Sequence, residues 1–368
     1  MQDTVKILED FISRELIQID TGALFSTSMV PKMPGFDYRR VEGMLLGAAI
    51  GDALGNTTEG MFPGERRKRF GEIREYLPDP VTGKEYGYPS DDTQLTFWTL
   101  DQLMEDGEFV PGHLTDRFAS GGEIFGIGRT VREFIAHRKA GVPWYQCGPN
   151  SAGNGAIMRI APMLIPHLKT GGTKVWADTA IAAMITHNDR ASISACLAYI
   201  AMLYELMGMD GAPHAGWWKE QYVGCTNDLE GENSTYFTRN EVFFDFAGPL
   251  WRFIEYVIPW AAERKLSSLE ACDAWYSGAY LLETVPSVLY ILSKHAHDPQ
   301  EAIVRAVNDT VDNDTIASLV GAAIGALYGP EAFPDTWTQR LTGRTSHNDD
   351  GTVQQLIAKS KQVFWDQQ

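Results

Sequence analysis

Two acidic clusters, far apart in the sequence, carry the side chains best suited to chemistry. The first is the segment SDDT at residues 90–93, and the second is DNDT at residues 312–315. Each cluster stands directly before an apolar segment with helical periodicity, so each places carboxylates at the start of a predicted helix. A helix cap needs only one side-chain acceptor, and both clusters offer more oxygens than a cap can use.

Two interpretations of these clusters stay open on the residues alone. Asp, Ser and Thr favour helix N-caps, where they accept backbone hydrogen bonds and interact with the helix dipole. If the clusters instead converge, their carboxylates repel one another unless they are protonated or share a cation. Carboxylate and hydroxyl oxygens suit hard ions such as Mg²⁺, Mn²⁺ or Ca²⁺. An EF-hand is excluded, because Ile316 occupies the fifth loop position counted from Asp312 and the turn glycine is missing.

Glycines spaced four residues apart indicate how the clusters could be brought together. Such spacing places each set of glycines on one helical face, which predicts a close contact between two helices. Helices that pack closely also bring their flanking loops together, and here those loops lie next to acidic residues. The two sets are Gly43, Gly47, Gly51 and Gly55, and Gly321, Gly325 and Gly329.

Composition and charge exclude several classes of function. The chain has 368 residues, of which 44% are hydrophobic, and its 48 acidic against 31 basic residues give a net charge of −17. Nucleic acids and anionic membranes bind clustered Lys and Arg, so neither is an expected partner. No apolar run approaches the roughly 20 residues of a membrane span. The four cysteines form no CxxC pair and the N-terminus has no signal-peptide pattern, which predicts a cytoplasmic location.

Helical periodicity dominates the rest of the chain and predicts an all-α fold. Residues 1–37 are predicted to form a helix over 3–19 and an extended arm, and residues 38–368 a single helical domain. Residues 209–245 are rich in Gly, Asn, Glu and aromatics, which is typical of an irregular excursion over the surface beside a site. The predicted helices of the domain span residues 38–55, 92–106, 155–166, 174–187, 190–208, 271–283, 300–308, 315–328 and 352–365.

Five short motifs, in a fixed order, resemble those of the ADP-ribosylglycohydrolases, the DraG-like ADP-ribosylhydrolases. The family pattern combines a Gly-rich helix ending in GDALG, then [ST]-D-D-T, G-N-G-x-x-M-R-x-x-P, a T-H pair and D-x-D-T. One such motif would be a weak signal, whereas five in order over roughly residues 40–330 form a specific one. The matching segments here are GAAIGDALGNTTEG (47–60), SDDT (90–93), GNGAIMRIAP (153–162), TH (186–187) and DNDTIAS (312–318).

The resemblance implies an all-α domain with a binuclear Mg²⁺ or Mn²⁺ centre in a central cleft. It also implies removal of ADP-ribose from a modified side chain, often arginine. Glu59 would activate water or transfer a proton, and the other implied catalytic carboxylates are Asp91, Asp92 and Asp314. The implied substrate-binding residues are Gly153, Asn154, Gly155, His187 and Tyr280. The implied metal ligands are Ser90, Asp91, Asp92, Asp312, Asp314 and Thr315.

Two segments depart from the family pattern without removing an implied ligand. Thr310 and Val311 stand before DNDT where relatives often have glycines, and Asn188 and Asp189 follow the TH pair where many have Pro and His. Both departures bear on which substrate is preferred. Arg159, in the third motif, could reach a phosphate, but an Arg at a helix start is more often a structural ion-pair partner, which we favour.

The N-terminal residues 1–37 allow two interpretations. In the first, they dock on the domain that follows. In the second, they form a partner-binding arm. Some family members resemble this chain in carrying an N-terminal extension and act as immunity proteins against ADP-ribosylating toxins. The resemblance therefore makes an ADP-ribosylated protein the expected substrate and an ADP-ribosyltransferase toxin a second expected partner.

Two other functions stay open on sequence alone. An all-α metal phosphohydrolase would act on free nucleotides, but Glu72 and Glu75 give one ExxE pattern without an ExxD partner at close range. A non-catalytic binding protein on the same scaffold would be expected to lose metal ligands, and all of them are present here. The product separates an ADP-ribosylhydrolase from a phosphohydrolase, since glycosidic cleavage gives intact ADP-ribose and diphosphate cleavage gives AMP.

Overall fold

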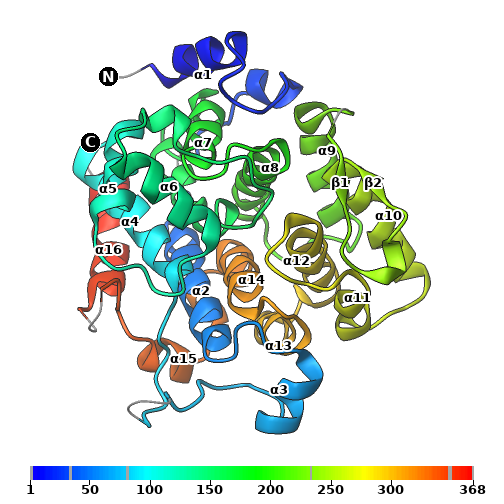
Figure 1. Ribbon diagram of the computed structural model, residues 1–368. Helices are drawn as coiled ribbons and strands as arrows, with labels where there is room; N and C mark the ends of the chain where they lie inside the picture. Colours follow the sequence, from blue (N-terminus) through cyan, green and yellow to red (C-terminus); the bar gives the residue numbers. More distant parts are fainter. Residues whose placement is uncertain (1–2, 33–34, 80–82, 233, 347–349, 367–368) are drawn as a thin grey trace.

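Helices make up most of the computed structural model, so the predicted all-α class is confirmed (Figure 1). The structure describes residues 3–32, 35–79, 83–232, 234–346 and 350–366. Within these ranges the only strands are β1 (Tyr236–Phe237) and β2 (Ala247–Gly248), which pair antiparallel, and no helix is long and apolar enough to cross a membrane. The α-helices are α1 (Thr4–Ser13), α2 (Arg39–Asn56), α3 (Pro63–Phe70), α4 (Asp91–Asp106), α5 (Pro111–Ser120), α6 (Arg129–Lys139), α7 (Lys174–Met184), α8 (Arg190–Leu206), α9 (Trp217–Glu230), α10 (Leu250–Glu263), α11 (Ser268–Trp275), α12 (Leu281–His295), α13 (Pro299–Asp309), α14 (Asn313–Tyr328), α15 (Asp335–Arg340) and α16 (Thr352–Lys361). The shorter helical segments are η1 (Ala23–Ser26), η2 (Trp144–Gln146), η3 (Ile157–Arg159), η4 (Ala161–His167), η5 (Glu241–Phe243), η6 (Pro330–Ala332) and the π-helical η7 (Gln362–Asp366).

Helices α2 and α14 cross the centre of the molecule side by side, and their glycines make this contact possible (blue and orange in Figure 1). A Cβ on Gly51 would lie 2.0 Å from the carbonyl oxygen of Ala317. No side chain fits at such a distance, so the predicted packing of the two glycine faces is confirmed. At one end of the contact Gly55 lies against Asp314, and the helix pair thereby brings the loop after α2 next to the second acidic cluster.

Replacing Gly51 with alanine tests how tightly this helix pair is packed. Alanine normally favours a helix over glycine by about 1 kcal/mol, but here its methyl group would press on the backbone of α14. We expect Gly51→Ala to lower the free energy of unfolding by roughly 2 kcal/mol or more, measured by chemical denaturation. Gly64 in α3 is the matched control, because a Cβ there would meet nothing within 4 Å. Equal effects at the two positions would contradict the close contact.

The predicted helix over 271–283 is wrong, because residues 276–280 separate α11 from α12. Tyr276 and Ser277 have φ angles of 82° and 50°, outside the helical region. The Ser277 carbonyl accepts a hydrogen bond of 3.0 Å from the backbone N–H of Asp312. The break therefore holds the segment that carries the second acidic cluster.

Two further segments also differ from the prediction. Residues 155–166 form the 3₁₀ segments η3 and η4 rather than an α-helix. Pro162 and Pro166 lack the N–H that α-helical hydrogen bonds require at their positions. The segment 209–245 contains the full helix α9 before it reaches β1, so its predicted irregularity holds only outside that helix.

The N-terminal segment is docked on the body in this structure. The predicted helix over 3–19 ends at Ser13, and α1 packs on α7 at the top of Figure 1. Thr4 is fully buried in that contact. Farther along, Met29 and Gly172 exchange two backbone hydrogen bonds, of 3.0 and 2.9 Å. Residues 1, 2, 33 and 34 of the predicted arm lie outside the described ranges.

Candidate metal centre

Ser90 and Asp52 together cap the start of α4, so the carboxylates of Asp91 and Asp92 are not used for capping. Asp52 is fully buried in α2 and accepts hydrogen bonds from the backbone N–H groups of Ser90 and Thr93, at 2.9 and 3.0 Å. The Thr93 hydroxyl also donates to it, at 2.6 Å. Ser90, the N-cap residue, accepts from the backbone N–H of Asp92 at 3.3 Å. Asp52 fills the rest of the capping role that the sequence left open for Asp91 and Asp92. Asp52 was not among the predicted site residues. The feature of the sequence that could have indicated its role is a single acidic residue within an apolar helix.

The second cluster meets the first where α4 and α14 begin. The Thr315 hydroxyl donates to Asp92 Oδ2 over 3.1 Å, which joins the two clusters directly. Asp312 stands at the N-cap of α14, yet its side chain makes no capping hydrogen bond there. Its Oδ2 instead accepts from the Asn154 amide at 2.6 Å. The clusters therefore converge, as the pairing of the glycine-rich helices led us to expect.

Glu59 joins the acidic group from a third segment, the loop after α2. One carboxylate oxygen from each of Glu59, Asp312 and Asp314 lies within 4.8 Å of the other two. Glu59 is exposed and both aspartates are buried, so Glu59 stands on the solvent side of the group. Oxygens at this spacing can share a small hard cation.

Burial and crowding make these carboxyl groups hold protons tightly. Burial first, and neighbouring carboxylates second, raise the pKa of Asp91 to about 8. Burial likewise raises the pKa of Asp312 to about 7, and the pKa values of Asp92 and Asp314 lie well above their usual range. Asp92 Oδ1 is buried without a hydrogen-bond partner among the described residues. A divalent cation would supply both the missing charge and that partner, so this oxygen-only donor set fits Mg²⁺ or Mn²⁺.

A cavity of about 160 Å³ opens over the acidic group. Ser90 and Tyr280 are predicted site residues that do not line it; the Ser90 hydroxyl lies behind the lining, 3.4 Å from Asp92 Oδ2. The predicted residues that line the cavity are Glu59, Asp91, Asp92, Gly153, Asn154, Gly155, His187, Asp312, Asp314 and Thr315.

One wall of the cavity was not predicted, the glycine-rich segment that leads into α6. Gly126, Gly128 and Arg129 belong to this wall. Arg129 is exposed and is the only Lys or Arg among the described residues of the lining. Gly126 has a φ of 67°, and a Cβ there would lie 3.2 Å from Asp91 Oδ1. The signal for this wall was the run GGEIFGIG, whose glycines allow the backbone to approach a ligand closely.

The predicted glycine loop at 153–155 also lines the cavity and is fixed by its backbone. The Asn154 N–H donates to the Ala279 carbonyl at 3.1 Å, and Gly153 pairs with Tyr280 in an isolated bridge. The Tyr280 ring lies 5.3 Å from the guanidinium of Arg239. Tyr280 thus supports the loop from outside the cavity.

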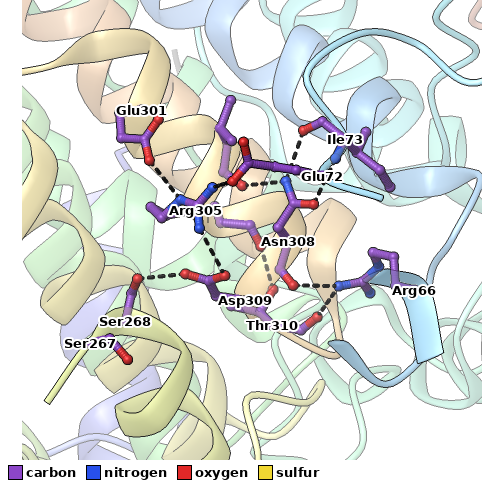
Figure 2. Close-up of polar contacts among 12 residues, drawn as sticks. Arg66, Glu72, Ile73, Ser267, Ser268, Glu301, Arg305, Asn308, Asp309 and Thr310 are labelled. Carbon is purple, nitrogen blue, oxygen red and sulfur yellow. Dashed lines mark hydrogen bonds and ion pairs between the residues drawn. The ribbon is translucent and has the colours of Figure 1, made fainter. Parts of the chain in front are cut away.

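Arg66 of α3 is fully buried and clamps the loop that carries Glu59 to the segment that precedes Asp312 (Figure 2). Its guanidinium donates to the Met61 carbonyl at 2.8 Å on one side and to the Thr310 carbonyl at 2.7 Å on the other. Burial lowers the pKa of Arg66 to about 10, so the group is still charged at neutral pH. The Thr310 carbonyl would be present with glycine at position 310 too, so what the departure adds is the Thr310 hydroxyl, which donates to the Ala306 carbonyl at 2.6 Å.

Removing this clamp should weaken both the fold and the metal centre. In Arg66→Met several buried carbonyls lose their donor, and we expect the free energy of unfolding to fall by roughly 3 kcal/mol. We also expect Mn²⁺ to bind roughly tenfold more weakly, because residues behind the ligands hold them in place. Denaturation and Mn²⁺ titration measure the two effects. Arg67→Met is the matched control on the exposed side of α3, and an equal loss there would contradict the clamp.

The departure at Asn188 is where the N-terminal arm attaches beside the cavity. The Asn188 side chain accepts from the Gln18 N–H at 2.9 Å and donates to the Leu16 carbonyl at 2.8 Å. Asp189 caps α8 by accepting a backbone hydrogen bond of 3.1 Å. Both residues follow His187 directly, so the docked arm is connected to one wall of the cavity.

Known proteins share both the sequence pattern and the architecture of this chain. A sequence model of the family described as ADP-ribosylglycohydrolase matches residues 34–365. ADP-ribosylarginine hydrolase Tri1 of Pseudomonas putida (strain GB-1) is 26% identical over 341 residues, which cover 88% of this chain and 79% of that protein. The ADP-ribosyl-[dinitrogen reductase] glycohydrolase of Rhodospirillum rubrum is 25% identical over 325 residues, which cover 87% and 96%. A solved structure, "ADP-ribosylglycohydrolase-related protein complex", shares the fold with a TM-score of 0.65 and 24% identity, over 89% of this chain and 96% of that one. The chain therefore belongs to the ADP-ribosylglycohydrolase family.

Proposed function

We propose that this protein is a metal-dependent hydrolase that removes ADP-ribose from ADP-ribosylated arginine side chains of proteins. The strongest support is the convergence of two distant acidic clusters and Glu59 on one cavity beside a glycine loop. Membership of the ADP-ribosylglycohydrolase family supports the reaction class. Similarity to an ADP-ribosylarginine hydrolase supports arginine as the acceptor.

The acidic group is the proposed site of two divalent cations, Mg²⁺ or Mn²⁺. When bound, such cations supply positive charge that offsets the carboxylates, orients ribose hydroxyls and lowers the pKa of a nearby water. The chain holds the donors in place: Asp52 fixes the start of α4, and Asn154 fixes Asp312. The proposed ligands are Ser90, Asp91, Asp92, Asp312, Asp314 and Thr315.

Glu59 is the proposed acid–base residue. Although Glu59 keeps contact with solvent, partial desolvation of its carboxylate beside the acidic group, and after it the charge of Asp52, raise the pKa of Glu59 above its usual value, towards the range where a carboxylate can take up and return a proton. Its place on the solvent side lets it accept a proton from water as the water oxygen bonds to the anomeric carbon. As the glycosidic C–N bond breaks, Glu59 returns that proton to the departing guanidine nitrogen, so that water is added across the bond. The catalytic part proposed for Asp91, Asp92 and Asp314 is to hold the cations that would orient the ribose hydroxyls.

The glycine loop and His187 are the proposed contacts for the ribose and the diphosphate. Gly153 and Gly155 have no side chains, so the loop backbone can approach phosphate oxygens closely. Asn154 is 7% exposed and is tied to Asp312, which places the loop next to the metal ligands. Tyr280 is included as the residue that pairs with Gly153 and sets the loop's position.

Identification of the product tests this function and separates it from the two alternatives. Wild-type protein with Mg²⁺ or Mn²⁺ is incubated with arginine-ADP-ribosylated protein, and the released nucleotide is identified by mass spectrometry. We expect intact ADP-ribose and unmodified arginine, and no release in EDTA. Release of AMP would support a phosphohydrolase of nucleotides. Metal binding without release from arginine, serine or nucleic-acid linkages would support a protein that acts by binding alone.

Residues 1–37 are proposed as a separate functional unit, an arm that binds an ADP-ribosyltransferase toxin while the body reverses the toxin's modification. The support is that residues before position 34 lie outside the family match, and that docked α1 leaves the acidic Glu9 and Asp10 exposed. Val30 is 68% exposed farther along the arm. All four cysteines are free, which fits the cytoplasmic location proposed for such an immunity protein.

Substitutions on the exposed face of the arm test this role better than deletion, since deletion would also uncover Asn188 and α7. We expect Asp10→Lys with Val30→Asp to weaken toxin binding and to leave ADP-ribose release at the wild-type rate. Calorimetric titration with the purified transferase measures the first effect. Unchanged affinity for the toxin would contradict the proposal that the arm binds this partner.

A further inference from the structure

Arg159, Thr186 and His187 form a buried chain of hydrogen bonds that ends at the cavity. Arg159 Nη2 donates to the Thr186 hydroxyl at 2.7 Å, and that hydroxyl lies 3.0 Å from His187 Nδ1. Arg159 and Thr186 are fully buried, and His187 is 1% exposed and lines the cavity. The ion pair expected of Arg159 is not found within the described residues. Its guanidinium lies instead 4.7 Å from the ring of Phe118, and Nε and Nη1 have no hydrogen-bond partner there.

The donors in this chain determine where each proton lies. An arginine guanidinium can only donate, so the Thr186 oxygen must accept from Arg159. The Thr186 hydroxyl keeps one proton to donate, and His187 Nδ1 is the acceptor that the described structure offers it. If Nδ1 carried a proton, it would donate to the Thr186 oxygen, and the buried Thr186 proton would then have no acceptor among the described residues. Such an unsatisfied group disfavours that tautomer by about tenfold.

We propose that Arg159 and Thr186 are positioning residues that hold His187 in the neutral tautomer with its proton on Nε2, as a fixed hydrogen-bond donor to a phosphate or hydroxyl oxygen of the ligand. That the ligand is ADP-ribose rests on the proposed function, whereas the tautomer does not. A neutral donor orients an anionic group without adding a charge that must be desolvated. Burial, and after it the charge of Arg159, lower the pKa of His187 to about 3, in agreement with a neutral ring.

The glycine loop leaves the Nε2 edge of the ring free. A Cβ on Gly155 would lie 2.8 Å from His187 Cε1 and 3.1 Å from Nε2. A Cβ on Gly153 would lie 3.5 Å from Nε2, an ordinary contact. Gly155 is thus required for the ring to keep this position, while Gly153 is not. The second glycine of the motif therefore serves the histidine as well as the backbone approach to the ligand.

Nitrogen NMR of the full chain tests the tautomer directly. Protein labelled with ¹⁵N-histidine gives long-range ¹H–¹⁵N correlations, and the His187→Gln variant identifies the signals of His187. At pH 7 we expect a protonated Nε2 and an unprotonated, hydrogen-bonded Nδ1. A proton on Nδ1, or a doubly protonated ring, would overturn the proposal whatever the protein's activity.

Variants of Thr186 then test what holds the tautomer. In Thr186→Val we expect the Nδ1 signal to move to the position of a nitrogen without a hydrogen bond, and the Kd for ADP-ribose to rise roughly tenfold. Thr186→Ser should restore both. Thr179→Val is the matched control, because Thr179 is fully buried on α7 and its hydroxyl has no partner among the described residues. Unchanged His187 signals in Thr186→Val would overturn the positioning role.

Glycine variants provide a second measurement that does not depend on Thr186. We expect Gly155→Ala to shift the His187 signals and to raise the Kd for ADP-ribose at least roughly tenfold, because the methyl group displaces the ring. Gly153→Ala should change both much less. If wild-type protein fails to bind ADP-ribose, the proposed function fails, but the NMR result still decides the tautomer. Equal shifts in the two alanine variants would contradict the placement of the Nε2 edge.

Discussion

An Asp314→Asn variant is expected to release ADP-ribose at least about a thousandfold more slowly than the wild type, because the centre loses a charged ligand. Asp314 lies at the start of α14, buried against Gly55, with one of its carboxylate oxygens within 4.8 Å of oxygens of Glu59 and Asp312. The same substitution replaces a buried carboxyl, whose pKa burial and then the charge of Asp312 raise well above the usual range, with a neutral amide that needs no proton. We therefore expect the metal-free variant to unfold at a higher temperature than the metal-free wild type.

Asp309→Asn is the matched control for this prediction. Asp309 is also a buried acid, but its carboxylate accepts from Ser268 at 2.5 Å and pairs with Arg305 at 3.4 Å, outside the cavity (Figure 2). We expect it to lose stability and to keep its turnover rate within about twofold, the range of a change remote from the site. Steady-state rates and thermal unfolding with EDTA separate the two variants. Equal loss of turnover in both variants would show that Asp314→Asn acts by disturbing the fold and not by removing a metal ligand.

Added Mg²⁺ or Mn²⁺ is expected to stabilise the protein strongly at pH 8 and hardly at pH 5. The pKa of Asp91 is about 8 and that of Asp312 about 7 in the folded protein, so at pH 5 protons occupy the groups that the cations need. At a hundredfold excess over Kd, each bound ion contributes about 2.7 kcal/mol. For a chain of this length that corresponds to about 3 °C in Tm for each ion.

The metal-free protein should show the opposite dependence on pH. A carboxyl whose pKa is higher in the folded than in the unfolded chain stabilises the fold at low pH, and this contribution is lost as pH rises through the folded pKa. The Tm in EDTA should therefore fall between about pH 4, where the aspartates of the unfolded chain lose their protons, and about pH 8, the raised folded value of Asp91. Thermal scans over this range, with and without metal, measure both curves. Parallel curves would mean that protons and cations do not compete for the carboxylates.

The sequence was sufficient to predict the elements that the site depends on most. Glycines at intervals of four residues predicted the pairing of α2 and α14, because a missing side chain at regular helical spacing has few other uses. The excess of carboxylates over what a cap needs predicted that the clusters at 90–93 and 312–315 have a further role. The structure brings both together with the loop of Glu59.

Other parts of the site could not be predicted because long-range contacts decide them. Helix α3 is rich in charged residues and was not predicted, yet its Arg66 is buried by backbone carbonyls from the other end of the chain. Asp52 acts on residues 90 and 93, a pairing that no local pattern reveals. The break at residues 276–280 places the Ser277 carbonyl where it accepts a hydrogen bond from the backbone N–H of Asp312. In each case the partner lies far away in sequence, where propensity and periodicity carry no information.

Anomalous diffraction from crystals grown with Mn²⁺ near pH 7.5 tests most directly the claim that cations hold the converging carboxylates together. The expected result is strong manganese peaks in the cavity, within coordinating distance of Asp92 Oδ1 and of the carboxylates of Asp312 and Asp314. Those peaks should be lost in Asp314→Asn and retained in Asp309→Asn. A cavity without manganese, at a concentration that fully supports ADP-ribose release in solution, would contradict the account.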